Sequence, residues 1–136
     1  MRWLLFVALA GCAALGFAAC GGVITIGPTA PGDGIIIYMH ANYVGTSQQL
    51  AVDVSNLADV EGPCLKGDDQ SATARWDDCV SSVRVMSGWQ ATLYRDRDFK
   101  GPSVTIKADT PDLTRVPGPC SGSFNDCISS IRVSRQ

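Results

Sequence analysis

Two stretches of the chain, WDDCVSSVRV at residues 76–85 and FNDCISSIRV at residues 124–133, are nearly the same ten residues. Each stretch has a pair of Asp or Asn residues, a Cys and two serines, and then alternates apolar residues with Arg. A catalytic site is usually built once. The duplicated polar cluster therefore indicates either a repeated turn or a repeated binding site.

The similarity extends from these stretches back towards the N-terminus. Residues 37–64 align with residues 93–120 without a gap, and the first copy then carries eight extra residues within residues 65–76. The matched positions include Tyr38 with Tyr94, Tyr43 with Phe99, Gly45 with Gly101, and Gly62-Pro63-Cys64 with Gly118-Pro119-Cys120. Self-similarity of this kind indicates a duplicated structural unit that covers nearly all of the mature chain.

Each copy has the pattern of β-structure. The runs IIIYMH (35–40) and ATLYRD (91–96) are rich in β-formers, and each leads through a Gly into a second alternating run, which predicts a hairpin. In the last run of each copy the alternation directs Val83, Val85, Ile131 and Val133 to a core and Arg84 and Arg132 to water. Trp76 and Phe124, which precede the two acidic turns, are expected to anchor that core.

Four strands per copy, with a long connection before the last, are typical of a Greek key. One such unit of about 45 residues has too little core to be stable alone. We therefore expect an all-β fold in which two Greek-key motifs form one β-sandwich.

The N-terminus differs in composition from the rest of the chain. Residues 1–19 have an early Arg2 and then an apolar run, as in a secretory signal peptide, and residues 20–34 have the composition of a tether. The signal resembles those of bacterial lipoproteins, in which a Cys is lipidated and becomes the first mature residue. Lipidation at Cys20 would give a signal of the usual length. The residues that precede Cys12 match the lipoprotein cleavage sequence better, but they would leave a very short signal. Cleavage by the ordinary secretory route is also compatible with the sequence. We expect export, to the outer membrane or periplasm as a lipoprotein or as a secreted protein.

The overall composition excludes some classes of function. The 136 residues carry a formal charge of −2 and the pI is about 5.1, so the sequence has no basic stripe for binding nucleic acid. The sequence also lacks a nucleophile with a recognisable base and a glycine-rich phosphate loop. We expect a protein that is not an enzyme, and contact with a membrane only through a lipid anchor.

These residues resemble the βγ-crystallins, in particular their microbial, calcium-binding members. A repeat of that family has an aromatic residue, a second aromatic a few residues on, and then x-Gly, as in Tyr38, Tyr43 and Gly45. Its calcium-binding members carry Asn/Asp-Asn/Asp-x-x-Ser/Thr-Ser before the last strand. Residues 77–82 (DDCVSS, the first hexamer) and 125–130 (NDCISS, the second hexamer) match that motif throughout. The resemblance implies a βγ-crystallin-like domain over residues 35–136, with Greek key one at 35–88 and Greek key two at 89–136.

The resemblance also implies about two calcium ions per chain, each held between the two hexamers. Ca²⁺ takes six to eight oxygen ligands. The implied carboxylates are those of Asp78 and Asp126, and the implied hydroxyls are those of Ser81 and Ser129. Backbone carbonyls are implied in the hexamers and the first hairpins, at or near Asp77, Cys79, Asn125, Cys127, His40 and Asp96. Ser82 and Ser130 are expected to hold the turn. The alternative is a turn that binds nothing, since Asp, Asn and Ser also bond to nearby backbone.

The four cysteines beyond the signal are expected to form disulfides in an oxidising compartment. Cys64 and Cys120 occupy equivalent positions of the repeat, as do Cys79 and Cys127. Among the three possible connectivities the repeat favours Cys64–Cys79 and Cys120–Cys127, which close the loop before the last strand in both copies.

Two other functions remain open at this point. Some bacterial metalloprotease inhibitors resemble βγ-crystallins and are disulfide-linked, so a protease is a possible partner, with the inserted loop at 65–76 as the inhibitory segment. A module that binds glycans or surfaces is the other, because a flat β surface leaves little trace in sequence.

Overall fold

The computed structural model describes residues 32–65 and 73–136. The residues expected to form the signal peptide (1–19), Cys12, Cys20, most of the expected tether and most of the inserted loop lie outside the described residues. The described residues form β-strands and short 3₁₀ turns, with no α-helix among them and no helix capable of spanning a membrane.

The two copies contain the same elements in the same order. The first copy has β1 (Ile35–His40), η1 (Ala41–Tyr43), β2 (Val44–Leu50), η2 (Leu57–Asp59), β3 (Glu61–Cys64) and β4 (Ser82–Val85). The second has β5 (Trp89–Asp96), η3 (Arg97–Phe99), β6 (Lys100–Ile106), η4 (Leu113–Arg115), β7 (Pro117–Cys120) and β8 (Ser130–Arg135).

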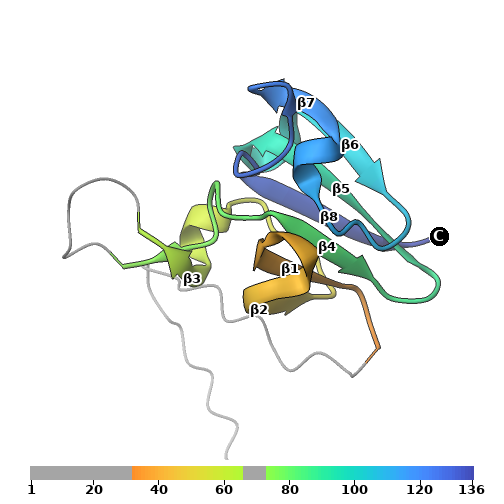
Figure 1. The fold of residues 1–136 in the computed structure, drawn as a ribbon. Coiled ribbons are helices and arrows are strands. Elements are labelled where there is room, and N and C mark those ends of the chain that lie inside the picture. The colour runs from red at the N-terminus through yellow and green to blue at the C-terminus, as the bar shows by residue number, and fades with distance from the viewer. Residues whose placement is uncertain (1–31, 66–72) are drawn as a thin grey trace, which may run out of the picture.

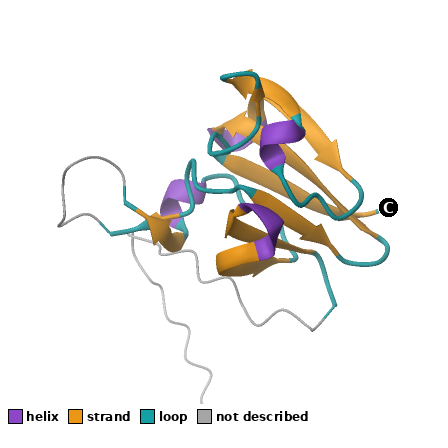
Figure 2. Cartoon of the chain, viewed as in Figure 1, coloured by secondary structure: helices purple, strands orange, loops and turns teal. Residues whose placement is uncertain are grey.

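Two antiparallel three-stranded sheets form the sandwich, with strand orders β2-β1-β4 and β6-β5-β8. Figure 1 shows that each sheet comes from one copy and that the two sheets pack against each other, and Figure 2 shows the short turns at their ends. The expected all-β sandwich is confirmed.

The two copies exchange backbone pairing across the sandwich. Val54, from the connection after β2, bridges Ile131 in β8 through two backbone hydrogen bonds of 2.8 and 2.9 Å. Thr110, from the connection after β6, makes the equivalent bonds to Val83 in β4, at 2.8 and 2.9 Å. Each copy therefore contributes backbone pairing to the sheet of the other.

Asp53 and Asp109 reinforce this exchange. The Asp53 carboxylate accepts the amide of Val133 and the Asp109 carboxylate accepts the amide of Val85, both at 2.8 Å. Asp53 and Asp109 occupy equivalent positions of the two copies, and each caps a backbone amide of the other copy.

The third strand of each copy departs from a regular four-stranded sheet. β3 and β7 lie outside both sheets and instead bridge residues Arg75 and Ser123 just before the hexamers. The sequence explains this position, because Pro63 and Pro119 have no N–H to donate to a ladder.

The core forms where the sequence alternation places it. Val83 and Ile131 are fully buried, whereas Arg84 and Arg132 are exposed. Trp76 and Phe124 are buried in the same cluster, so their predicted anchoring role is confirmed.

Two buried serines fix the turn that follows the first strand of each copy. The Ser130 hydroxyl donates to the Asp96 carbonyl at 2.6 Å and accepts the Phe99 amide at 3.0 Å. Ser82 makes the same two bonds, at 2.6 and 3.1 Å, to His40 and Tyr43. The expectation that these two serines hold the turn is confirmed.

Ser130→Ala should lower the free energy of unfolding by about 1–3 kcal/mol, because it removes the buried hydroxyl that bonds both the Asp96 carbonyl and the Phe99 amide. Urea denaturation measures the change. Ser103→Ala, on an exposed position of β6, is the matched control and should be close to neutral. Equal effects of the two substitutions would contradict the role given to Ser130.

Candidate metal centre

The two hexamers lie side by side and are joined by backbone hydrogen bonds. The Asp78 amide donates to the Ile128 carbonyl and the Asp126 amide donates to the Val80 carbonyl, both at 3.1 Å. These reciprocal bonds hold together two segments that are 48 residues apart in the sequence. The juxtaposition expected from the duplicated motif is therefore present.

The second position of each hexamer has an unusual backbone conformation. Asp78 and Asp126 have φ values of 54° and 50°, in the left-handed region that Asp and Asn tolerate better than most residues. The conformation alone accounts for part of the preference for Asp at this position.

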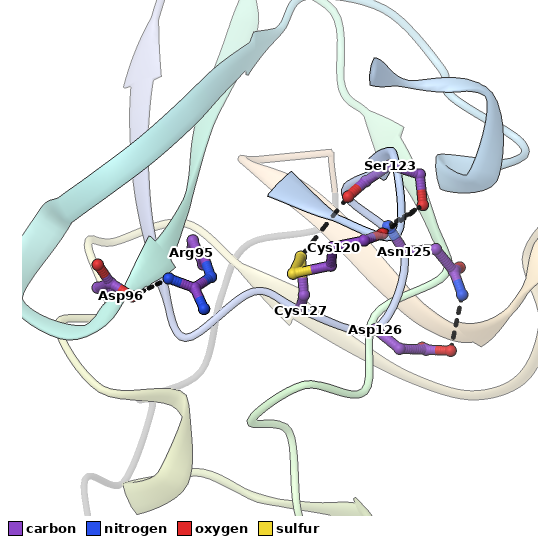
Figure 3. The surroundings of a disulfide bond; sticks show 7 residues. All are labelled: Arg95, Asp96, Cys120, Ser123, Asn125, Asp126 and Cys127. Atoms are coloured by element: carbon purple, nitrogen blue, oxygen red, sulfur yellow. Dashed lines mark hydrogen bonds and ion pairs between the residues drawn. A yellow bond between two sulfur atoms is a disulfide. The ribbon is translucent and has the colours of Figure 1, made fainter. Parts of the chain in front are cut away.

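One cavity of about 350 Å³ collects most of the residues implied for one calcium site. It is lined by Asp78 of the first hexamer and by three residues of the second, Asp126, Cys127 and Ser129, together with Asp96 from the end of β5. We call this group the second clamp. The remaining wall is formed by Arg95 and by Cys120, which is one half of the Cys120–Cys127 disulfide (Figure 3).

The equivalent residues of the first copy form what we call the first clamp: the His40 carbonyl, the first hexamer and Asp126. The Ser81 hydroxyl donates to Asp126 Oδ1 at 3.0 Å, so two of the implied ligands already meet across the copies. The other oxygen of that carboxylate, Oδ2, accepts from the side-chain Nδ2 of Asn125 at 2.7 Å (Figure 3). His40, Asp77, Ser81 and Asn125 do not line the cavity of the second clamp.

Asp77 differs from the other residues of the motif. Its side chain is buried, and its Oδ2 lies 3.6 Å from the guanidinium of Arg97 in η3. In the second hexamer the equivalent residue is the neutral Asn125, and the position equivalent to Arg97 is Ala41. Sequence reasoning did not identify Arg95 or Arg97. The available signal was the contrast between RDRD at 95–98 and MHAN at 39–42.

Both expected disulfides, Cys64–Cys79 and Cys120–Cys127, are present, with Cα–Cα distances of 5.9 and 6.2 Å. Each bridge ties the third position of a hexamer to the strand before it. Cys79 and Cys127 are buried. Within residues 32–65 and 73–136 no three His, Cys, Asp or Glu side chains converge as a metal-binding cluster. A metal held here would consequently depend on carbonyl and hydroxyl oxygens as well as carboxylates.

A second cavity of about 320 Å³ lies between η1 and the connection that leads into η4, and its lining includes Asn42, Asp109 and Asp112. Hydrogen bonds from the Thr114 hydroxyl, and then from its amide, lower the pKa of Asp112. Asp112 also caps η4, so these bonds have a structural explanation.

Comparison with known proteins identifies the family. The sequence model of peptidase inhibitor family I36 matches residues 37–106. A βγ-crystallin domain from Flavobacterium johnsoniae is 33% identical, covers 76% of this chain and 96% of its own, and superposes with a TM-score of 0.55. The chain is a member of peptidase inhibitor family I36 with a βγ-crystallin domain.

Two further relatives agree with this assignment. The βγ-crystallin of Ciona intestinalis is 26% identical, with coverage of 76% of this chain and 99% of that chain and a TM-score of 0.54. Spherulin-3A of Physarum polycephalum is 28% identical over 102 residues, which are 74% of this chain and 81% of that protein. The resemblance inferred from the two hexamers is confirmed at the level of the family.

Removing either disulfide from this βγ-crystallin domain should destabilise it. The loop-entropy model gives about 2.5 kcal/mol for Cys120–Cys127 and about 3 kcal/mol for the longer Cys64–Cys79 loop. Double Cys→Ala variants of each pair, compared by guanidinium denaturation, test this order. Unchanged stability in both variants would show that the bridges do not constrain the unfolded chain.

Proposed function

We propose that this domain binds two calcium ions, one in each clamp, and that the ions act with the disulfides to stabilise it. One observation carries the proposal: a cavity lined by Asp78 of the first copy also contains Asp96, Asp126 and Ser129 of the second. A turn that merely capped its own backbone would not need the carboxylate of the other copy.

The donor set suits calcium. Carboxylate, carbonyl and hydroxyl oxygens are the ligands of a hard cation. In the second clamp Asp78 and Ser129 would supply side-chain oxygens, and the backbone at Asp96 and Cys127 would supply carbonyls. In the first clamp the same roles would fall to Asp126, Ser81 and the backbone at His40 and Cys79. A bound ion would supply a cross-link between the two copies.

The carbonyls of His40 and Asp96 remain usable although each accepts a serine hydroxyl. A carbonyl oxygen has two lone pairs and can accept a second interaction. The cavity of about 350 Å³ has room for an ion and several waters, each of which occupies about 30 Å³ in the liquid. Water can therefore complete a coordination shell of six to eight oxygens.

Moderate affinity follows from the small number of charged ligands. With about one carboxylate per clamp, we expect a Kd of roughly 10⁻⁶ to 10⁻³ M, the range of sensor and extracellular sites. An exported protein meets calcium at such concentrations. The signal-like residues 1–19 and the two disulfides support export. Lipidation of Cys20 would keep the domain at the cell envelope.

Calorimetric titration of the domain should show about two Ca²⁺ per chain. At a hundredfold excess of calcium over Kd each ion adds about 2.7 kcal/mol to the free energy of unfolding, which raises Tm by about 10–20 °C. Asp126→Ala combined with Ser129→Ala should weaken both sites, because each substitution removes a ligand from a different clamp. Parent-like uptake by this double variant would show that the assigned ligands are wrong.

We propose peptidase inhibition as a second function, and the match of residues 37–106 to an inhibitor family is the observation that favours it. A rigid, disulfide-linked β-sandwich suits an inhibitor, because little conformational freedom is lost when it binds. The two functions are compatible, since the clamps lie between the two copies and the inserted loop belongs to neither clamp.

Assays of purified secreted metalloproteases with the whole chain test this second function. We expect inhibition of at least one enzyme, and loss of inhibition when residues 66–73 are deleted. A deletion variant that inhibits as well as the parent would remove the inserted loop from the inhibitory surface. Unchanged protease activity throughout would remove the function itself.

A further inference from the structure

The two clamps are chemically unequal, although the backbone around them is nearly symmetric. The Ser82 and Ser130 turns, the paired amides of Asp78 and Asp126, and the exchanged bridges all occur twice. The ion pair between Asp77 and Arg97 cannot occur twice, because Asn125 and Ala41 occupy the equivalent positions.

Each partner of this ion pair is the sequence neighbour of a residue of the second clamp, although neither partner lines the cavity itself. Asp77 precedes Asp78, and Arg97 follows Asp96, so each partner is adjacent in sequence to a residue that lines the cavity. The pair connects η3 of the second copy to the first hexamer, and these are two of the segments that a bound ion would join. The Arg97 guanidinium is half exposed, whereas the Asp77 carboxylate is buried.

We propose that Arg97 is a tethered substitute for the cation at the second clamp. It balances the buried charge of Asp77 and holds the hairpin end against the first hexamer when calcium is absent. It also lowers the affinity of this clamp for calcium, because its positive charge acts against an incoming ion. This inference rests on the proposed calcium function and adds a residue that sets the affinity of one clamp.

A second arginine gives the same contrast between the copies. Arg95 lines the cavity and lies 3.6 Å from Asp96, while Met39 and His40 stand at the equivalent positions of the first copy. The second hairpin therefore carries two guanidinium groups, one lining the cavity and one paired with Asp77, whereas residues 39–41 of the first hairpin carry none.

Charge counting gives opposite effects for the two partners. Arg97→Ala removes one positive charge beside the second clamp, and Asp77→Asn removes one negative charge. A unit charge about 7 Å from a divalent ion in a well-solvated site changes the ion's affinity about five- to tenfold. The double variant has Asn and Ala at the two positions, like the equivalent pair Asn125 and Ala41 beside the first clamp, and should differ from the parent by less than about twofold.

The experiment is a double-variant cycle with CaCl₂ as the titrant. Calorimetry gives the affinities of the parent, Arg97→Ala, Asp77→Asn and the double variant. Amide NMR shifts of Cys127 and Ser129 report the second clamp, and those of Cys79 and Ser81 report the first. Arg115→Ala is the matched control, because Arg115 is exposed and lines the other cavity.

We expect Arg97→Ala to tighten binding at the second clamp about five- to tenfold and Asp77→Asn to weaken it by a similar factor, with the first clamp little changed. Without calcium, Arg97→Ala should melt at a lower temperature than the parent, and calcium should restore more stability to it than to the parent. Arg115→Ala should change neither the affinity nor this response.

Three outcomes would overturn the inference. If the parent binds two ions and Arg97→Ala leaves the second clamp unchanged or weaker, Arg97 only positions the hairpin, and the proposed calcium function survives. If Arg97→Ala changes the calcium affinity of both clamps equally, the ion pair acts through the stability of the whole fold and not on the second clamp. If the parent takes up no calcium, the inference and the proposed function fail together.

Discussion

The structure depends on the exchange of backbone hydrogen bonds between its two copies. Val54 pairs with Ile131 and Thr110 pairs with Val83, so the last strand of each copy is bounded by a segment of the other. The same exchange brings the hexamers together, because they immediately precede those last strands. The geometry that gives the sandwich a shared core therefore also creates a polar seam between the copies, and a ligand bound in that seam would stabilise the fold as a whole.

The sequence predicted the parts of the fold that local chemistry determines. Alternation identified the buried face of β4 and β8, and the duplicated Gly45 and Gly101 marked the start of the second strands, where both residues have positive φ. Local chemistry did not indicate that Asp53 and Asp109 cap the partner copy, because a capping Asp has the same local sequence whichever backbone it serves. The position of β3 and β7 outside the sheets was missed, although the prolines in those strands give the physical reason.

The candidate site was predictable where the motif is duplicated and was missed where the copies diverge. The repeat and the family resemblance both assign Asp78, Asp126 and Ser129 to the seam between the copies, and these three residues do line one cavity. Arg95 and Arg97 do not belong to the motif, and an alternating RDRD run on a β protein usually forms an exposed, self-paired surface. Only the three-dimensional arrangement shows that the second guanidinium of this run reaches the buried carboxylate of Asp77.

Divergence between duplicated sites is informative because the backbone serves as an internal control. Where the two copies keep the same residue, as with Ser82 and Ser130, the shared fold explains the choice without any ligand. Where the two copies have different side chains on the same backbone conformation, the fold does not require either side chain. Asn125 and Ala41 show that this backbone accommodates a neutral pair, so the ion pair between the buried Asp77 carboxylate and Arg97 is not a requirement of the turn. Burying a carboxylate is costly without a compensating positive charge. Its presence at one clamp alone is therefore most simply explained by the electrostatics of that clamp.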